Sequence, residues 1–134
     1  MRFASLGSGS KGNATVIESH KTRVLIDCGF NRKHTRLRLQ ELALDLKDLD
    51  AILVSHEHGD HAKGVVLVCE SIKKPFYATY GTARSAGWLD HPMYLKLAIF
   101  LFKLLWYRMT LKSLFNLLCR IRLSRLEYYP TLAL

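Results

Sequence analysis

Three histidines and one aspartate that suit metal binding lie within six consecutive positions of this 134-residue chain. His56, His58, Asp60 and His61 follow the pattern H-x-H-x-D-H. Imidazole nitrogens and carboxylate oxygens are donors that zinc accepts, and the same mixture also suits manganese or iron. The residue types and their spacing therefore predict a metal site.

The alternative is that these histidines are ordinary loop residues. The chain has six histidines, and a single histidine on a loop is usually only solvated. This cluster differs because it comes directly after the apolar run at 51–54. Spacing and position together favour the metal site.

The residues around the cluster predict how its side chains are positioned. The run at 51–54 predicts a buried strand. If that strand continues, the alternation of side chains places His56 and His58 on one side. Gly59 then lets the backbone turn, and the pattern changes towards a helix at Asp60 and His61.

Other elements follow from the same kind of pattern. A helix is expected over 31–43, where leucines recur among charged residues and Asn31 can cap the first turn. Alternating or β-branched residues predict further strands at 3–6, 14–18, 22–27 and 76–78.

The motif resembles the signature of the metallo-β-lactamase superfamily, in which a strand is followed by [ST]-H-x-H-x-D-H. The segments MRFASLGSGSKGN at 1–13, VLIDCG at 24–29 and PFYAT at 75–79 are similar to the branch with YycJ/WalJ-type exonuclease-like hydrolases. The resemblance covers about residues 1–91. It implies an α/β fold, the N-terminal half of an αββα sandwich, with a helix over 64–72, where composition alone leaves helix or strand open.

The resemblance also implies a role for each residue of the motif. His56 and His58 bind a first zinc ion and Asp60 and His61 a second, with Mn²⁺ as the alternative metal. Asp60 is implied as the catalytic residue that also orients the attacking water. Asp27 is implied to brace the histidine loop through hydrogen bonds, although a plain Asp-Cys-Gly turn is the alternative. The implied substrates are phosphodiesters or other esters and amides, with nucleic acid as the class for this branch.

A second motif, G-x-G-x-x-G, is formed by the glycines at 7, 9 and 12. This spacing binds dinucleotides only where it opens a helix. Here Asn13 is followed by β-branched residues in a strand pattern, so we interpret the glycines as a tight turn near the metal cleft.

Charge and cysteine usage limit the remaining classes. The formal net charge is +9, but residues 1–90 carry only +3 and residues 91–134 carry +6, so basicity says little about the metal-binding part. The three cysteines form no C-x-x-C pair, which fits a reducing cytosol and a cytoplasmic protein. The N-terminus lacks the apolar core of a signal peptide.

From residue 92 onward the composition changes. Residues 91–134 contain 13 leucines, no glycine and no aspartate. We expect 92–134 to be a divergent, mostly helical, apolar and basic tail, such as a shifted reading frame would produce, after a truncated metallo-β-lactamase-fold domain at 1–91. Charged residues interrupt the run, which disfavours a membrane span but leaves non-specific membrane association open.

The resemblance implies a further histidine, a bridging aspartate and a final histidine in later segments. His91 is the last histidine and no aspartate follows Asp90. We therefore expect incomplete metal occupancy and impaired or absent activity. Three functions stay open: a working metal-dependent hydrolase, a defective fragment that keeps the motif, and a membrane-associated protein that acts through its tail. No specific protein partner is indicated.

Overall fold

A computed structural model describes residues 1–97 of the chain. Its strands are β1 (Arg2–Gly7), β2 (Ala14–Ser19), β3 (Thr22–Ile26), β4 (Ala51–Leu53), β5 (Phe76–Thr79) and β6 (Tyr94–Leu97). Its helices are α1 (Arg32–Gln40), the short 3-10 helix η1 (Leu46–Asp48), α2 (Gly59–Ala62), α3 (Val65–Ile72) and α4 (Tyr80–Ser85).

The strands form one mixed sheet in the order β1-β2-β3-β4-β5-β6. The first three strands pair antiparallel, and β3 to β6 pair parallel. Each parallel connection crosses over through helical structure, as parallel pairing requires. The α/β fold predicted from the sequence is confirmed for the described residues.

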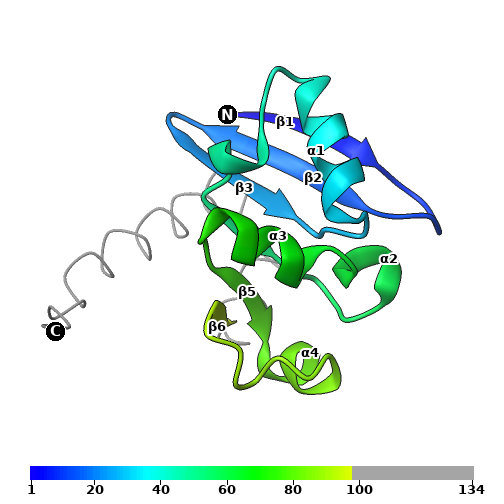
Figure 1. Cartoon of the computed structure of the whole chain (residues 1–134), viewed down its shortest axis with the longest axis vertical. Helices are drawn as coiled ribbons and strands as arrows, with labels where there is room; N and C mark the ends of the chain where they lie inside the picture. Colours follow the sequence, from blue (N-terminus) through cyan, green and yellow to red (C-terminus); the bar gives the residue numbers. More distant parts are fainter. Residues whose placement is uncertain (98–134) are drawn as a thin grey trace, which may run out of the picture. The chain divides into compact units, whose positions relative to one another are not determined.

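Helices α1 and α3 cover one face of the sheet (Figure 1). The core between them contains Leu39 of α1, Val68 of α3 and the strand residues Leu25, Ile52 and Phe76, all fully buried. Burying a side chain of this size contributes roughly 1.5–3 kcal/mol. This layer holds the ends of β3 and β4 in place.

Most of the predicted elements are confirmed. Asn31 caps α1, because its Oδ1 atom accepts a hydrogen bond of 2.9 Å from the backbone nitrogen of His34. Residues 65–72 form a helix, which resolves the ambiguity of that apolar run. Lys73 ends α3 in a left-handed conformation with φ 55°.

Strand β6 lies inside the segment 92–134, for which the sequence predicts mostly helix. Its residues pair in parallel with β5, and the backbone nitrogen of Phe76 bonds the carbonyl of Met93 at 2.9 Å. The sheet therefore continues past residue 91. The rest of that segment lies outside the described residues, so the expected tail and the division at 91 stay predictions.

In residues 1–97, no helix combines the length and the apolar character needed to cross a membrane.

Candidate active site

The histidine cluster lies where the parallel strands β3 and β4 end. Val54 continues from β4 and donates a backbone hydrogen bond of 2.8 Å to Tyr77. At Ser55 this pairing stops, because the backbone nitrogen donates instead to Oδ1 of Asp27 at 2.8 Å. Ligand sites in such sheets commonly occur beyond the carboxyl ends of the strands.

The motif does not continue the strand as expected. β4 ends at Leu53, and His56 and His58 lie in the loop that follows. Their rings are nevertheless close, with centroids 4.9 Å apart. The centroid of His61, which lies in α2, is 3.9 Å from that of His56. The expected change to a helix at Asp60 and His61 is confirmed.

Asp27 connects this loop to the end of β3. The residue is only 7% exposed, and its backbone is left-handed with φ 59°. Oδ2 lies 2.8 Å from Nδ1 of His61, and both carboxylate oxygens accept from the hydroxyl of Ser55 at 2.8–2.9 Å. The carboxylate thus contacts both ends of the histidine loop.

These hydrogen bonds fix where two imidazole protons lie. The carboxylate of Asp27 accepts, so Nδ1 of His61 carries a proton. The single hydroxyl proton of Ser55 goes to Asp27, so Ser55 accepts from Nδ1 of His56 at 2.9 Å. His56 therefore also donates from Nδ1. An imidazole that donates from Nδ1 in this way can bind a metal ion through Nε2.

Asn13 is a site residue that the sequence did not predict. Its Nδ2 atom donates to Oδ2 of Asp60 at 3.0 Å and lies 3.2 Å from Nε2 of His61. Its backbone nitrogen also donates to the carbonyl of Asp60 at 2.7 Å. Its side chain bonds both backbone polar atoms of Gly9 at 2.9 and 3.0 Å. The glycine-rich turn is therefore held against the histidine loop, and an asparagine closing that turn was the only available signal.

Two glycines near the loop have different roles. A Cβ atom on Gly29 would lie 1.7 Å from the carbonyl oxygen of Asp60, so only glycine permits this close approach. A Cβ atom on Gly59 would meet nothing within 4 Å, and its φ is not positive. The backbone does turn into α2 at Gly59, but the turn does not require glycine, because α2 begins there in a conformation that other residues also adopt.

The donor types fit zinc, but their arrangement is incomplete. Within residues 1–97, no group of three or more His, Cys, Asp or Glu side chains is placed so that it could hold a metal ion. Oδ2 of Asp60 lies 3.4 Å from Nε2 of His61, so these two potential metal-binding atoms are close to each other. His58 is exposed. The structure brings the predicted residues together without forming a finished metal centre.

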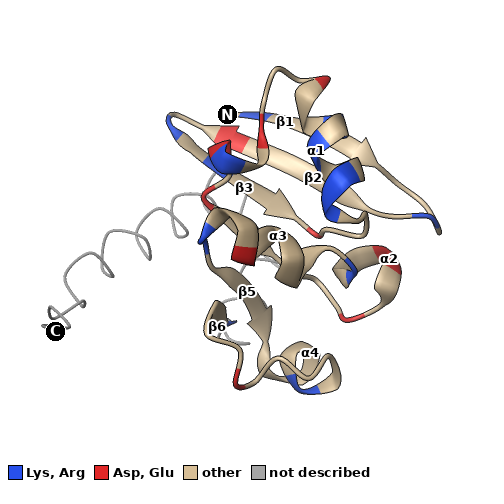
Figure 2. Ribbon diagram, viewed as in Figure 1, with Lys and Arg blue, Asp and Glu red and all other residues tan. Residues whose placement is uncertain are grey.

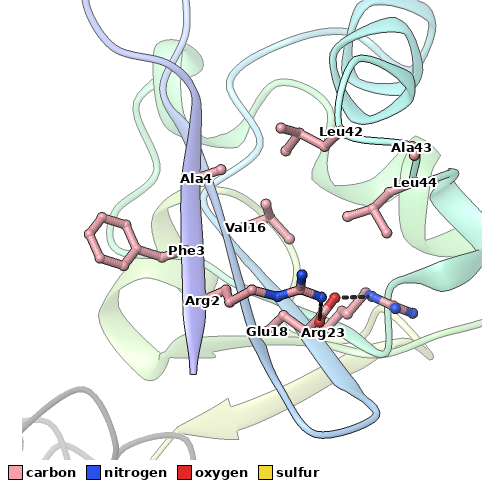
Figure 3. A pocket seen from close by; sticks show the side chains of 9 residues that line it. All are labelled: Arg2, Phe3, Ala4, Val16, Glu18, Arg23, Leu42, Ala43 and Leu44. Carbon is pink, nitrogen blue, oxygen red and sulfur yellow. Dashed lines mark hydrogen bonds and ion pairs between the residues drawn. The ribbon is translucent and has the colours of Figure 1, made fainter.

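A separate pocket of about 420 Å³ lies at the other end of β1–β3 (Figure 3). Glu18 accepts hydrogen bonds there from Arg23, at 2.6 Å, and from Arg2. These bonds lower the pKa of Glu18. None of the residues of the H-x-H-x-D-H motif lines this pocket, so we do not place the candidate site there.

Comparisons with known proteins agree with this geometry. The family model described as the metallo-beta-lactamase superfamily matches residues 7–112. Exodeoxyribonuclease YycJ of Bacillus anthracis is 34% identical over 82 residues, which cover 61% of this chain and 31% of that protein. Exodeoxyribonuclease WalJ of Streptococcus pneumoniae is 37% identical over 81 residues, with coverages of 60% and 30%.

More distant relatives extend the set. A ribonuclease Z of Clostridium botulinum is 36% identical over 53 residues, which cover 40% of this chain and 16% of that protein. Among solved structures, the subclass B3 metallo-beta-lactamase MEM-A1 from a soil metagenome library is 27% identical, with a TM-score of 0.52. The matched region covers 61% of this chain and 31% of that one. The chain spans less than a third of the length of the two exodeoxyribonucleases.

Proposed function

Because this chain belongs to the metallo-β-lactamase superfamily, we propose that it is a metal-dependent hydrolase of phosphodiester bonds in nucleic acid. The observation that carries the proposal is the hydrogen-bond network around Asp27. It engages Nδ1 of His56 and of His61, so each ring would bind a metal through Nε2, at the end of two parallel strands. The similarity to exodeoxyribonucleases and to a ribonuclease supports nucleic acid as the substrate class.

The proposed metal is zinc, with Mn²⁺ as an alternative. His56 and His58 would hold one ion, and Asp60 and His61 a second. When bound, such an ion would supply a nucleophile at neutral pH, because coordination lowers the pKa of water to about 7. Catalytic zinc sites have three protein ligands. The described residues do not form such a group, so we propose that His56, His58, Asp60 and His61 by themselves bind metal weakly.

The residues around the metal donors have separate tasks in this proposal. Asp27 keeps the proton on Nδ1 of His61, and Ser55 holds Nδ1 of His56. Asn13 bonds Oδ2 of Asp60, which directs that carboxylate towards His61. Asp60 is proposed to bind the metal and to orient the attacking water. A cytoplasmic location is consistent with this assignment and stays a prediction.

The test measures metal binding and hydrolysis in the same set of variants. Zinc affinity is determined by competition with a chromogenic chelator, and hydrolysis with end-labelled single-stranded DNA in the presence of Zn²⁺ or Mn²⁺. We expect His56→Ala and His61→Ala each to weaken zinc binding by roughly 10- to 100-fold and to lower hydrolysis by a similar factor. His20→Asn is the matched control, because His20 is exposed in a turn with φ 54° and asparagine tolerates that conformation.

Equal zinc affinity and equal hydrolysis in wild type, His56→Ala and His61→Ala would refute the proposal. Hydrolysis that persists after chelation of the metal would also count against it, because the proposed nucleophile depends on the ion. Residues 98–134, and with them the predicted membrane association of the tail, lie outside the described residues, and no feature of residues 1–97 supports a membrane function.

A further inference from the structure

Helix α1 carries an unusual concentration of positive charge. Four of its nine residues are basic, namely Arg32, Lys33, Arg36 and Arg38, and none is acidic. Arg38 is committed to the fold, because Nη1 donates to the carbonyl of Leu6 at 2.6 Å and the guanidinium lies 4.3 Å from the Phe30 ring centroid. The other three are exposed.

These three side chains line a groove of about 550 Å³ between α1, η1 and the end of α3. The lining residues are Arg32, Lys33, Arg36, Asp45, Leu46, Lys47, Ser71 and Ile72. Four of them are cations and one is an anion. Figure 2 shows basic residues recurring along α1.

The charges in this groove are not balanced within the described chain. Arg36 pairs with Asp45, with Nε 3.0 Å from Oδ2. Arg32, Lys33 and Lys47 have no ion pair among residues 1–97. Arg32 and Lys33 also stand in the first turn of α1, where the helix dipole is positive and a cation is unfavourable. A bound anion would reduce both the repulsion among these cations and their repulsion by the positive end of the helix dipole.

The carboxyl group of Asp45 responds to the same field. Burial alone would raise its pKa, but the hydrogen bond and charge of Arg36, together with hydrogen bonds from the backbone of Lys47 and Leu46, outweigh burial, and the pKa is lowered. The only ion pair in the groove is therefore the one between Arg36 and Asp45, among residues 1–97. Three positive charges are left to face solvent.

We infer that this groove binds the phosphate backbone of single-stranded nucleic acid. The inference rests on the proposed function, and it assigns that function a path for the substrate. Arg32 comes three residues after Gly29, whose backbone packs on Asp60, so the two Cα atoms are at most about 11 Å apart. The first turn of α1, where Arg32 and Lys33 stand, is thus the part of the groove placed near the histidine loop, and a strand cleaved at the loop would run on from this turn towards Lys47. Phosphate contacts from Arg and Lys position such a strand without reading its sequence.

The experiment compares two triple variants of the full chain that carry the same net charge. The groove variant is Arg32→Gln, Lys33→Gln and Lys47→Gln, which leaves the pair Arg36–Asp45 intact. The control variant is Lys21→Gln, Arg84→Gln and Lys96→Gln, at exposed positions that do not line the groove. Both variants keep the basic residues beyond 97, so any binding by those residues is the same in both. Thermal unfolding followed by circular dichroism confirms that each variant is folded.

Binding of a labelled single-stranded oligodeoxynucleotide is measured by fluorescence anisotropy, in EDTA to prevent cleavage, over a series of salt concentrations. Each phosphate contact to a single strand contributes about 0.7 to the slope of log K against log salt, so losing three contacts lowers the slope by about 2. If wild type and the groove variant bind equally at 1 M salt, this difference in slope makes the groove variant bind about a hundredfold more weakly than wild type at 0.1 M salt. The control variant should keep the wild-type slope. An equal loss in both variants, or no loss in the groove variant, would overturn the inference.

Two further measurements separate the groove from the active site and from membranes. Hydrolysis of bis(p-nitrophenyl) phosphate, which is too small to span the groove, should be the same in the groove variant and in wild type. If wild type does not hydrolyse this diester, the proposed function fails. The salt slope still shows whether the groove binds the oligonucleotide. Vesicles containing phosphatidylserine test the other anionic partner: loss of vesicle binding with unchanged oligonucleotide binding would overturn the inference.

Discussion

Asp27 and His61 are 34 positions apart in the sequence, yet Oδ2 of Asp27 lies 2.8 Å from Nδ1 of His61. The contact exists because β3 and β4 are parallel neighbours, so both strands deliver their next residues to the same edge of the sheet. The carboxylate is nearly buried and also accepts from the backbone and hydroxyl of Ser55. Asp27 is therefore a positioning residue for the imidazole of His61.

The first prediction concerns this contact. Asp27→Asn replaces an acceptor-only carboxylate by an amide that can donate to Nδ1 of His61, which favours the tautomer with its proton on Nε2. We expect zinc affinity to fall by roughly 10- to 100-fold, the usual effect of losing a hydrogen-bond partner of a metal ligand. A chelator competition gives the affinity, and ¹⁵N chemical shifts of the His61 ring give the tautomer.

Asp90→Asn is the control for that variant, because Asp90 is exposed in a turn away from the loop. A purely structural role for Asp27 would lower stability without changing the tautomer. An unchanged ring tautomer in Asp27→Asn would therefore contradict the positioning role.

The second prediction uses two glycines of the same region. Gly29→Ala forces a methyl group against the carbonyl of Asp60, at 1.7 Å in the present backbone. The loop must move, and overpacking of this kind costs about 1–3 kcal/mol of unfolding free energy. Gly59→Ala adds a methyl group in open space at the start of α2 and should change stability by no more than about 1 kcal/mol, in the stabilising direction. Urea unfolding measures the free energy of unfolding of both variants. Equal losses of this free energy would show that the close approach of Gly29 to Asp60 does not cause the destabilisation.

The sequence predicted the elements with a strong pattern but not every contact between them. The alternation in β2 and β3 and the capped, amphipathic α1 were predicted because these signals are local. The end of β4 at Leu53 was not, because Ser55 leaves the ladder to bond Asp27, which is 28 positions away in the sequence. β6 was missed because Tyr94–Leu97 opens a leucine-rich segment whose composition masks a short strand.

The same distinction holds within the candidate site. The spacing of His56, His58 and His61 is local and could be read directly, whereas the amide of Asn13 reaches Asp60 across 47 positions. A polar contact between residues so far apart in the sequence leaves no periodic pattern of residue types. It depends on how the glycine-rich turn folds back on the loop, which only the structure shows.

The third prediction follows from Asn13. Asn13→Ala removes the side-chain hydrogen bonds to Gly9, Asp60 and His61 and leaves their partners without these contacts. We expect a loss of about 1–3 kcal/mol in unfolding free energy, together with faster proteolysis within residues 8–11, where the turn would be released. Ser10→Ala, at an exposed position of the same turn, should leave both measurements unchanged. Unchanged protease sensitivity in Asn13→Ala would mean that the turn is held by other contacts.

The fourth prediction concerns the thiol of Cys28. It is fully buried behind the site, and burial raises its pKa from 9.0 to about 11, although the hydrogen bond with Thr35 acts in the opposite direction. A pKa raised by folding gives a stability contribution that is complete below the unfolded pKa and is lost as pH rises through the folded value. The free energy of unfolding should therefore fall between about pH 9 and pH 11, and this fall should be smaller in Cys28→Ser.

Native protein should also be alkylated by iodoacetamide at Cys28 far more slowly than unfolded protein, as peptide mass mapping can show. Equal rates of modification in native and urea-unfolded chains would contradict the buried position of this side chain, and with it the packing of Gly64 against Cys28 that connects α2 to α3.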